Sequence, residues 1–299
     1  MPILFLILVI AGVGSKAFSK LCSNILSQNS VSKYSLVLVI NSFVACLFFA
    51  FSSGLRIFAN GVTLIYSVAY ALIAMISIVS GVVVYRYATV SNVNILSSSC
   101  GMICTAVVGW MLFMEEVVVS GVIRLAIMLI AIALVFLDQK SGGIANTEKK
   151  KKCNNIALAL MIAIISASAC ANTVVLKAFA MSERVTDENS FFFLTNVFLL
   201  VASLIVFAVA CLRKQGEFRD AVKLLRPNKI IAIAGNTVCS NIGSLVCVLI
   251  VAQLDVSIYS PVSSALGIIA GVIGSLIFKE KLGVFAYVAV AVALIAVII

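Results

Sequence analysis

The stretch SSCGMICTAVVGWMLFMEE at residues 98–116 decides the fold, because a second stretch repeats its pattern 165 residues later. That second stretch reads SSALGIIAGVIGSLIFKEK at residues 263–281. Shared Ser-Ser, Gly and Phe-x-Glu positions at one common offset indicate an internal repeat rather than chance pairing of apolar residues. Between residues 98 and 134, the identities at this gapless shift include Ser98/Ser263, Ser99/Ser264, Ile103/Ile268, Val107/Val272, Gly109/Gly274, Phe113/Phe278, Glu115/Glu280, Ala126/Ala291, Leu129/Leu294, Ile130/Ile295 and Ala131/Ala296.

The chain is far more apolar than a soluble protein. Of its 299 residues, 63% are hydrophobic and 11% are charged, whereas soluble domains carry about 25% charged residues. Long apolar runs such as 123–137, with one charge at Arg124, and 284–299 approach the roughly 20 residues that cross a bilayer as a helix. Strands of a membrane barrel would instead alternate in hydrophobicity. The sequence therefore predicts an all-α, polytopic membrane protein.

Ten apolar segments are long enough to be membrane spans, and they divide into two sets of five. Residues 1–139 form the first set and residues 156–299 the second, joined by a basic hydrophilic linker at 140–155. Because five is odd, two homologous sets must cross the membrane in opposite directions, as the inverted repeats of secondary transporters do. The starts of the two halves align more weakly, at an offset of 157 that pairs Lys20 with Lys177. The expected spans are 3–24, 34–52, 61–84, 92–114, 118–138, 154–178, 190–212, 229–252, 256–278 and 283–299.

This order of spans resembles the drug/metabolite transporter superfamily, and within it the EamA-type ten-helix branch. Phe113–Glu115 follows the fourth span and Phe278–Glu280 the ninth, each with a glycine-containing apolar helix after it. The resemblance covers nearly the whole chain, although the first span carries residues 12–15, Gly-Val-Gly-Ser, where the family often has Trp-Gly-Ser. It implies alternating-access transport of a small organic metabolite or drug. A lipid-linked sugar flippase and a non-transporting membrane scaffold are the alternatives.

Enzymatic chemistry is not expected. The chain has no histidine, which removes the commonest general base and the usual partner of a catalytic serine or cysteine. Most of the nine cysteines lie inside or at the ends of apolar spans, and Cys100 and Cys104 lack further metal ligands nearby. We therefore expect no catalytic residue, no metal and no cofactor. The expected partners are a small-molecule substrate and the lipid bilayer, with a homodimer as an open alternative.

Polar side chains within the spans are the candidates for a substrate site, because such residues are rare in a bilayer. Asn236, Ser240, Asn241 and Ser244 share one face of the eighth span. Helix–helix hydrogen bonding is the competing explanation for such residues. The full candidate set is Lys16, Tyr66, Tyr70, Ser77, Asn94, Asn236, Ser240, Asn241, Ser244 and Tyr259.

Charged residues near the spans are few. Lys20 and Lys177 lie near span ends, where a flexible stem lets the ammonium reach the headgroups. Lys16 lies deeper in its span and is the better candidate for contact with substrate. Glu280 opens a short connection between two lysines, which favours a solvated interfacial position, and Glu115 opens the matching one. No other acid lies in the middle of a span, which weakens the case for proton or sodium coupling.

The net charge of +10 comes from cations placed between the spans, which argues against nucleic acid as a partner. Seventeen of the 21 cations lie on the side reached after odd-numbered spans. The positive-inside rule then puts the 140–155 linker in the cytoplasm and both termini outside, whereas the family resemblance implies cytoplasmic termini. The expected location is an inner or plasma cell membrane, with multiple spans.

Overall fold

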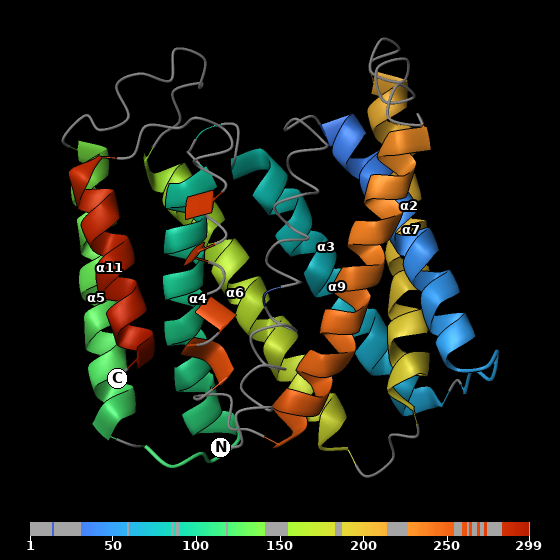
Figure 1. Ribbon diagram of the computed structural model, residues 1–299, viewed down its shortest axis with the longest axis horizontal. Coiled ribbons are helices and arrows are strands. Elements are labelled where there is room, and N and C mark those ends of the chain that lie inside the picture. The colour runs from blue at the N-terminus through green and yellow to red at the C-terminus, as the bar shows by residue number, and fades with distance from the viewer. Residues whose placement is uncertain are drawn as a thin grey trace. The chain divides into compact units, whose positions relative to one another are not determined.

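The structure is a computed structural model, and its regular elements are helices (Figure 1). No strand occurs in the part of the chain that it describes. It describes residues 31–58, 60–84, 87, 90–117, 119–140, 155–182, 187–213, 227–253 and 283–298, together with isolated positions at 14, 259–261, 263–264, 268–269 and 272–273.

Eight long helices are described, and their bounds agree with the apolar runs to within a few residues. The expected span 3–24 lies outside the described residues, apart from position 14, and the expected span 256–278 is described only at its isolated helical positions. The helices are α2 (Val31–Ser52), α3 (Gly61–Val84), α4 (Val90–Leu112), α5 (Val119–Lys140), α6 (Asn155–Ala180), α7 (Glu188–Arg213), α9 (Pro227–Gln253) and α11 (Val284–Ile298).

Six of these helices are long and apolar enough to cross a membrane, namely α2, α3, α4, α6, α7 and α9. The apolar stretches of α5 and α11 are shorter, at Val119–Leu134 and Val284–Ile295. Large apolar side chains such as Phe43, Ile65 and Leu129 are exposed along the helices, as they would be against lipid. The chain is a multi-pass membrane protein, as its composition predicts.

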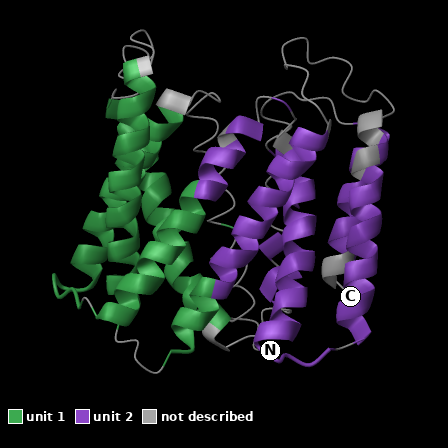
Figure 2. Ribbon diagram, turned by 180° about the vertical axis from the view of Figure 1, so that it is seen from behind, with its two compact units in different colours: residues 1–75, 175–252 green, residues 76–174, 253–299 purple. Residues whose placement is uncertain are grey.

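The chain divides into two compact units that do not follow the two sequence halves (Figure 2). Unit 1 comprises residues 1–75 and 175–252, and unit 2 comprises residues 76–174 and 253–299. The boundary between the units therefore cuts through α3 and α6. Each unit combines segments from both halves of the sequence, so a unit is distinct from a sequence repeat.

In unit 1, α2 packs along α7, and α9 joins them through an apolar cluster. Leu36 and Val37 of α2 are buried against Ile233 of α9, with Phe207 of α7 packed on the cluster. Helices in a membrane associate by close packing and hydrogen bonds, because lipid offers no hydrophobic driving force between them. This cluster brings the polar side chains of α9 against α2.

An aromatic cluster lies at the other end of unit 1, where α7 begins. The rings of Phe179 and Phe191 stack with centroids 4.1 Å apart, and Phe49 stacks on Phe192 at 5.1 Å. Helix α7 begins here because Asp187 accepts hydrogen bonds from the backbone N–H groups of the first turn.

In unit 2, α5 packs against α4 and α11 (Figure 1). Helix α11 has three fully buried alanines, Ala286, Ala289 and Ala293, spaced three and four residues apart on one face. Small residues at this spacing let two helix backbones approach closely. Met128 and Ala131 of α5 are also fully buried.

Candidate functional site

The polar face of α9 is turned into unit 1 at Thr237 and Asn241, which are one helical turn apart and both buried. The Thr237 hydroxyl lies 2.5 Å from Asn41 Oδ1 of α2 and 2.8 Å from the carbonyl oxygen of Ile233. A hydroxyl has a single proton to donate, so these two acceptors already use it. Thr237 therefore joins α9 to α2 by a hydrogen bond and has no proton left to donate to a ligand.

Asn241 is 8% exposed, and its Nδ2 has no hydrogen-bond partner among the described residues. Leaving a buried donor unsatisfied costs about 1–3 kcal/mol. Asn241 also lies near the middle of the 27-residue helix α9, about 20 Å from either end at a rise of 1.5 Å per residue. An unsatisfied amide donor is therefore held at the depth where a membrane site would be most shielded from water.

The remaining candidates on α9 are only half-buried. These are Asn236, Ser240 and Ser244. The Ser244 hydroxyl donates to the carbonyl oxygen of Ser240 at 3.1 Å, a bond within the helix. The predicted face is thus divided. Asn241 points inward together with Thr237, which sequence reasoning did not include in this face. The side chains of Asn236, Ser240 and Ser244 lie nearer the surface of unit 1.

Tyr66 and Tyr70 of α3 lie in the aromatic cluster of unit 1. The ring of Tyr66 meets Phe179 edge-on at 6.0 Å, and the ring of Tyr70 meets Phe191 edge-on at 5.6 Å. Edge-to-face pairs of this kind stabilise packing. Ser77, the third candidate on α3, is half-buried and belongs to unit 2.

In unit 2 the serines of α4 form a hydrogen-bonded seam. The Ser166 hydroxyl of α6 lies 3.3 Å from the carbonyl oxygen of Ser97 and 2.9 Å from that of Ile162 in its own helix. The Ser264 hydroxyl donates to the carbonyl oxygen of Ser98 at 3.1 Å. The contacts with Ser97 and Ser98 are of the kind expected of small polar residues between helices in a membrane. Of the candidates in this unit, Asn94 is half-buried and Tyr259 is buried.

Five further polar groups are buried without a hydrogen-bond partner in the described part of the chain. Two belong to unit 1, the hydroxyls of Thr63 on α3 and Thr195 on α7. Three belong to unit 2, the hydroxyl of Ser99, Oδ1 of Asn172 and Nε of Arg124. Sequence reasoning did not select Thr195 or Asn172. The only available signal was the rarity of such residues in a membrane span.

Lys177 is enclosed by unit 1, although snorkelling was expected. Its side chain is 6% exposed in the last turn of α6, whereas a snorkelling lysine leaves its ammonium outside the protein. That prediction is wrong for Lys177, because the end of α6 is covered by its neighbours in unit 1. Lys16 and Lys20 lie outside the described residues.

Glu115 is also buried, at 9% exposure, at the end of α4. Its carboxylate folds back over Gly109, the glycine that precedes it by six residues. The backbone N–H groups of Phe113 and Glu115 both donate to the carbonyl oxygen of Gly109. An acid that sequence position alone would place in solvent is therefore part of the packing at the α4–α5 corner.

No family model matches this chain, and no curated protein matches it either. Among solved structures it is similar to one titled only as the crystal structure of a protein, with a TM-score of 0.56 and 11% sequence identity. The match covers 96% of this chain and 96% of the other. The chain therefore shares the overall fold of a solved protein along almost its whole length.

Proposed function

We propose that this protein is a transporter that moves a small organic metabolite or drug across the membrane by alternating access. The observation that carries the proposal is the unsatisfied Nδ2 of Asn241 at the middle of α9. A buried polar group is normally satisfied by protein or water. A membrane scaffold would have no reason to keep a costly open donor at this depth, whereas a carrier needs one to contact its cargo.

The packing of the helices supports the further proposal of two inverted five-helix repeats of the EamA type. In two such repeats, α2 corresponds to α7 and α5 to α11. These are the pairs that pack together, α2 on α7 in unit 1 and α5 on α11 in unit 2. Contact between equivalent elements is expected near a two-fold axis. The hydrogen bond from Ser264 to Ser98 joins the two serine pairs that the 165-residue shift superimposes.

The chemistry of the buried polar groups that lack a hydrogen-bond partner among the described residues suggests the kind of cargo. Asn241 offers an amide N–H donor, and Thr195 offers a hydroxyl that can donate or accept. Both are neutral and belong to unit 1. A cargo with carbonyl or hydroxyl oxygens, such as an amino acid, a sugar derivative or an amphipathic drug, would satisfy the Asn241 donor through a hydrogen bond rather than an ion pair.

A ligand-stabilisation screen on the purified protein in detergent tests the proposal. A ligand that binds only the folded state stabilises it by about 2.7 kcal/mol at a concentration of 100 times its Kd. We expect compounds with carbonyl or hydroxyl oxygens to raise the melting temperature of the wild type, and Asn241→Leu to lose that rise.

Asn196→Leu is the matched control for that screen. Asn196 is also an amide in an apolar helix, but its Nδ2 donates to the carbonyl oxygen of Phe192 at 2.8 Å. Its replacement should lower the melting temperature without ligand and leave the ligand-induced rise intact. A rise that survives Asn241→Leu unchanged would contradict the assignment of Asn241 to the site.

A further inference from the structure

The turn between α2 and α3 is apolar, although connections between helices are usually polar. Phe51 is 71% exposed, Leu55 is 70% exposed and Phe58 is 58% exposed. Arg56 is also exposed, between the last two. Because the turn joins the ends of two helices able to cross the membrane, it lies at the boundary between lipid and water.

The backbone of the turn is fixed by its own hydrogen bonds. The N–H of Leu55 donates to the carbonyl oxygen of Ala50 at 2.8 Å, and that of Gly54 donates to Phe51 at 3.0 Å. This pair of bonds is a Schellman motif, which ends a helix with a left-handed residue. Gly54 and Leu55 both have positive φ, at 61° and 63°. A leucine with a left-handed backbone conformation is strained, so holding Leu55 outward in this turn costs conformational free energy.

Two more hydrogen bonds tie this region to the start of α7 within unit 1. The backbone N–H of Phe58 donates to the Ser190 hydroxyl at 3.0 Å, and the Ser52 hydroxyl donates to Asn189 Oδ1 at 3.2 Å. The turn is thus anchored at both ends. Its exposed apolar side chains are presented by an ordered backbone.

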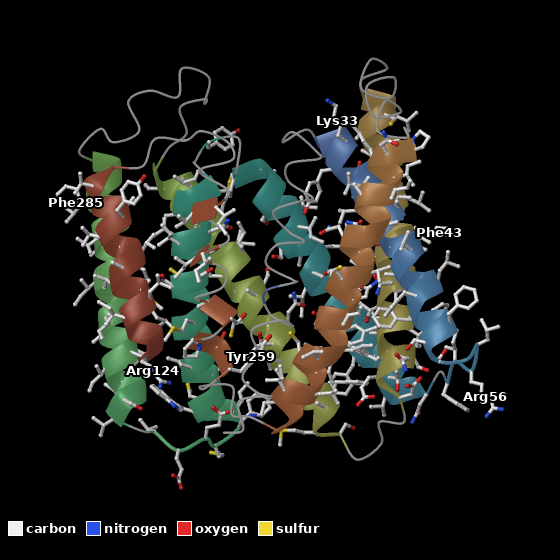
Figure 3. The ribbon with its side chains drawn as sticks, in the orientation of Figure 1. Lys33, Phe43, Arg56, Arg124, Tyr259 and Phe285 are labelled. Carbon is white, nitrogen blue, oxygen red and sulfur yellow. The ribbon has the colours of Figure 1, made fainter. Side chains whose placement is uncertain are left out.

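The exposed side chains continue a stripe on the outer face of α2. Phe43, Leu47 and Phe51 are all exposed and are spaced four residues apart, so they share one helix face. In Figure 3, Phe43 points outward from α2 and Arg56 extends away from the turn that follows α2. Along the chain, the apolar stripe is followed by Leu55 and then by Arg56, its first exposed charge.

We propose that this turn is a phospholipid-binding site at the membrane interface. Phe51, Leu55 and Phe58 lie among the upper acyl chains, and the guanidinium of Arg56 binds the lipid phosphate. A phospholipid presents apolar chains and then a phosphate in the same order as the stripe and Arg56. Arginine binds phosphate oxygens through paired hydrogen bonds, and apolar side chains at an interface enter the acyl boundary by about 5–10 Å.

Fluorescence quenching in vesicles tests this site. The single native tryptophan, Trp110, is replaced by phenylalanine, and Phe58→Trp introduces a probe in the turn. Leu55→Trp is a second, independent probe position in case the first variant does not fold. The vesicles contain phosphatidylcholine and phosphatidylglycerol with bromine atoms in the upper acyl chains, and acrylamide serves as the aqueous quencher.

We expect the brominated lipids to quench most of the emission and acrylamide to quench little. Quenching by acrylamide without quenching by the lipids would overturn the proposal, because the turn would then lie in water. Resistance to both quenchers would also overturn it, because a second copy of the chain would then cover the turn.

The role of Arg56 is tested by reversing its charge. Arg56→Glu repels the lipid phosphate, so quenching by the brominated lipids should fall and quenching by acrylamide should rise. Lys229→Glu reverses an exposed cation at the start of α9 and should change neither. Equal effects of the two substitutions, or no effect of either, would show that Arg56 does not bind the phosphate.

Discussion

A carboxylate oxygen of Glu115 lies 2.7 Å from the point where a β-carbon on Gly109 would stand. Only glycine leaves room for this arrangement, because real β-carbons are not found so close to an oxygen. The same two residue types recur six residues apart as Gly274 and Glu280, which lie outside the described residues. The contact gives a physical reason for a glycine at position 109.

Gly109→Ala should therefore destabilise the protein. The added methyl group must displace the end of the buried Glu115 side chain. Because only the end of a flexible side chain has to move, we expect a cost of about 1 kcal/mol, the low end of the range for overpacking. The measurement is the melting temperature in detergent. Gly235→Ala is the control, because nothing lies within 4 Å of its β-carbon position on α9. That substitution should be neutral or stabilising by about 0.5–1 kcal/mol. Equal melting temperatures for the two variants would contradict the packing of Glu115 on Gly109.

Thr237→Val should loosen the contact between α2 and α9. The substitution removes the hydrogen bond to Asn41 and should cost about 0.5–1.5 kcal/mol. Thr173→Val removes a hydroxyl whose one hydrogen bond among the described residues goes to Ala169, within its own helix, and should cost less. Thermal unfolding of both variants in one detergent makes the comparison. A larger loss for Thr173→Val would argue against the α2–α9 tie.

Asp187→Ala should destabilise the start of α7. Its carboxylate accepts hydrogen bonds from the backbone N–H groups of Asn189 and Ser190 and from the Ser190 hydroxyl. Loss of such a cap typically costs about 0.5–2 kcal/mol. Asp187→Asn keeps an oxygen acceptor and should recover part of the loss. If the alanine and asparagine variants unfold alike, the carboxamide oxygen does not replace the carboxylate as a cap.

The orientation of the chain is predicted from its cations. A reporter fused after Ile299 should be active outside the cytoplasm, and one inserted in the 140–155 linker should be active inside. The reason is that the lysine-rich linker is retained on the cytoplasmic side. A C-terminal reporter that is active only in the cytoplasm would reverse this assignment and agree with the family resemblance.

The helices could be predicted from the sequence because each is a long apolar run, and run length is a local property. The spacing of polar residues on α9 marks a face that contains Asn241, but it did not show which of them point inward, since Asn236, Ser240 and Ser244 are half-buried. By contrast, the enclosure of Lys177 depends on segments far away in the chain. Helical periodicity does not reveal which distant side chains cover a helix end.

The division into two units could not be predicted for the same reason. The boundary between the units passes inside α3 and inside α6, where the apolar runs show no break in composition. Likewise, the contact between Ser166 and Ser97 joins two helices that the sequence separates by the whole of α5. The serines could be selected from the sequence as rare polar residues. Whether a serine packs against another helix or contacts a ligand depends on which residues lie beside it in the folded chain.

The central claim is that Asn241 contacts cargo, and a paired measurement on Asn241→Leu tests it most directly. The melting temperature without ligand and the rise caused by a compound from the stabilisation screen are measured in the same detergent. Because Nδ2 makes no hydrogen bond among the described residues, the account predicts that the ligand-free variant melts at or above the wild-type temperature. It also predicts that the ligand-induced rise is lost. A lowered ligand-free melting temperature with an intact ligand-induced rise would show that Asn241 serves only packing, and would contradict the account.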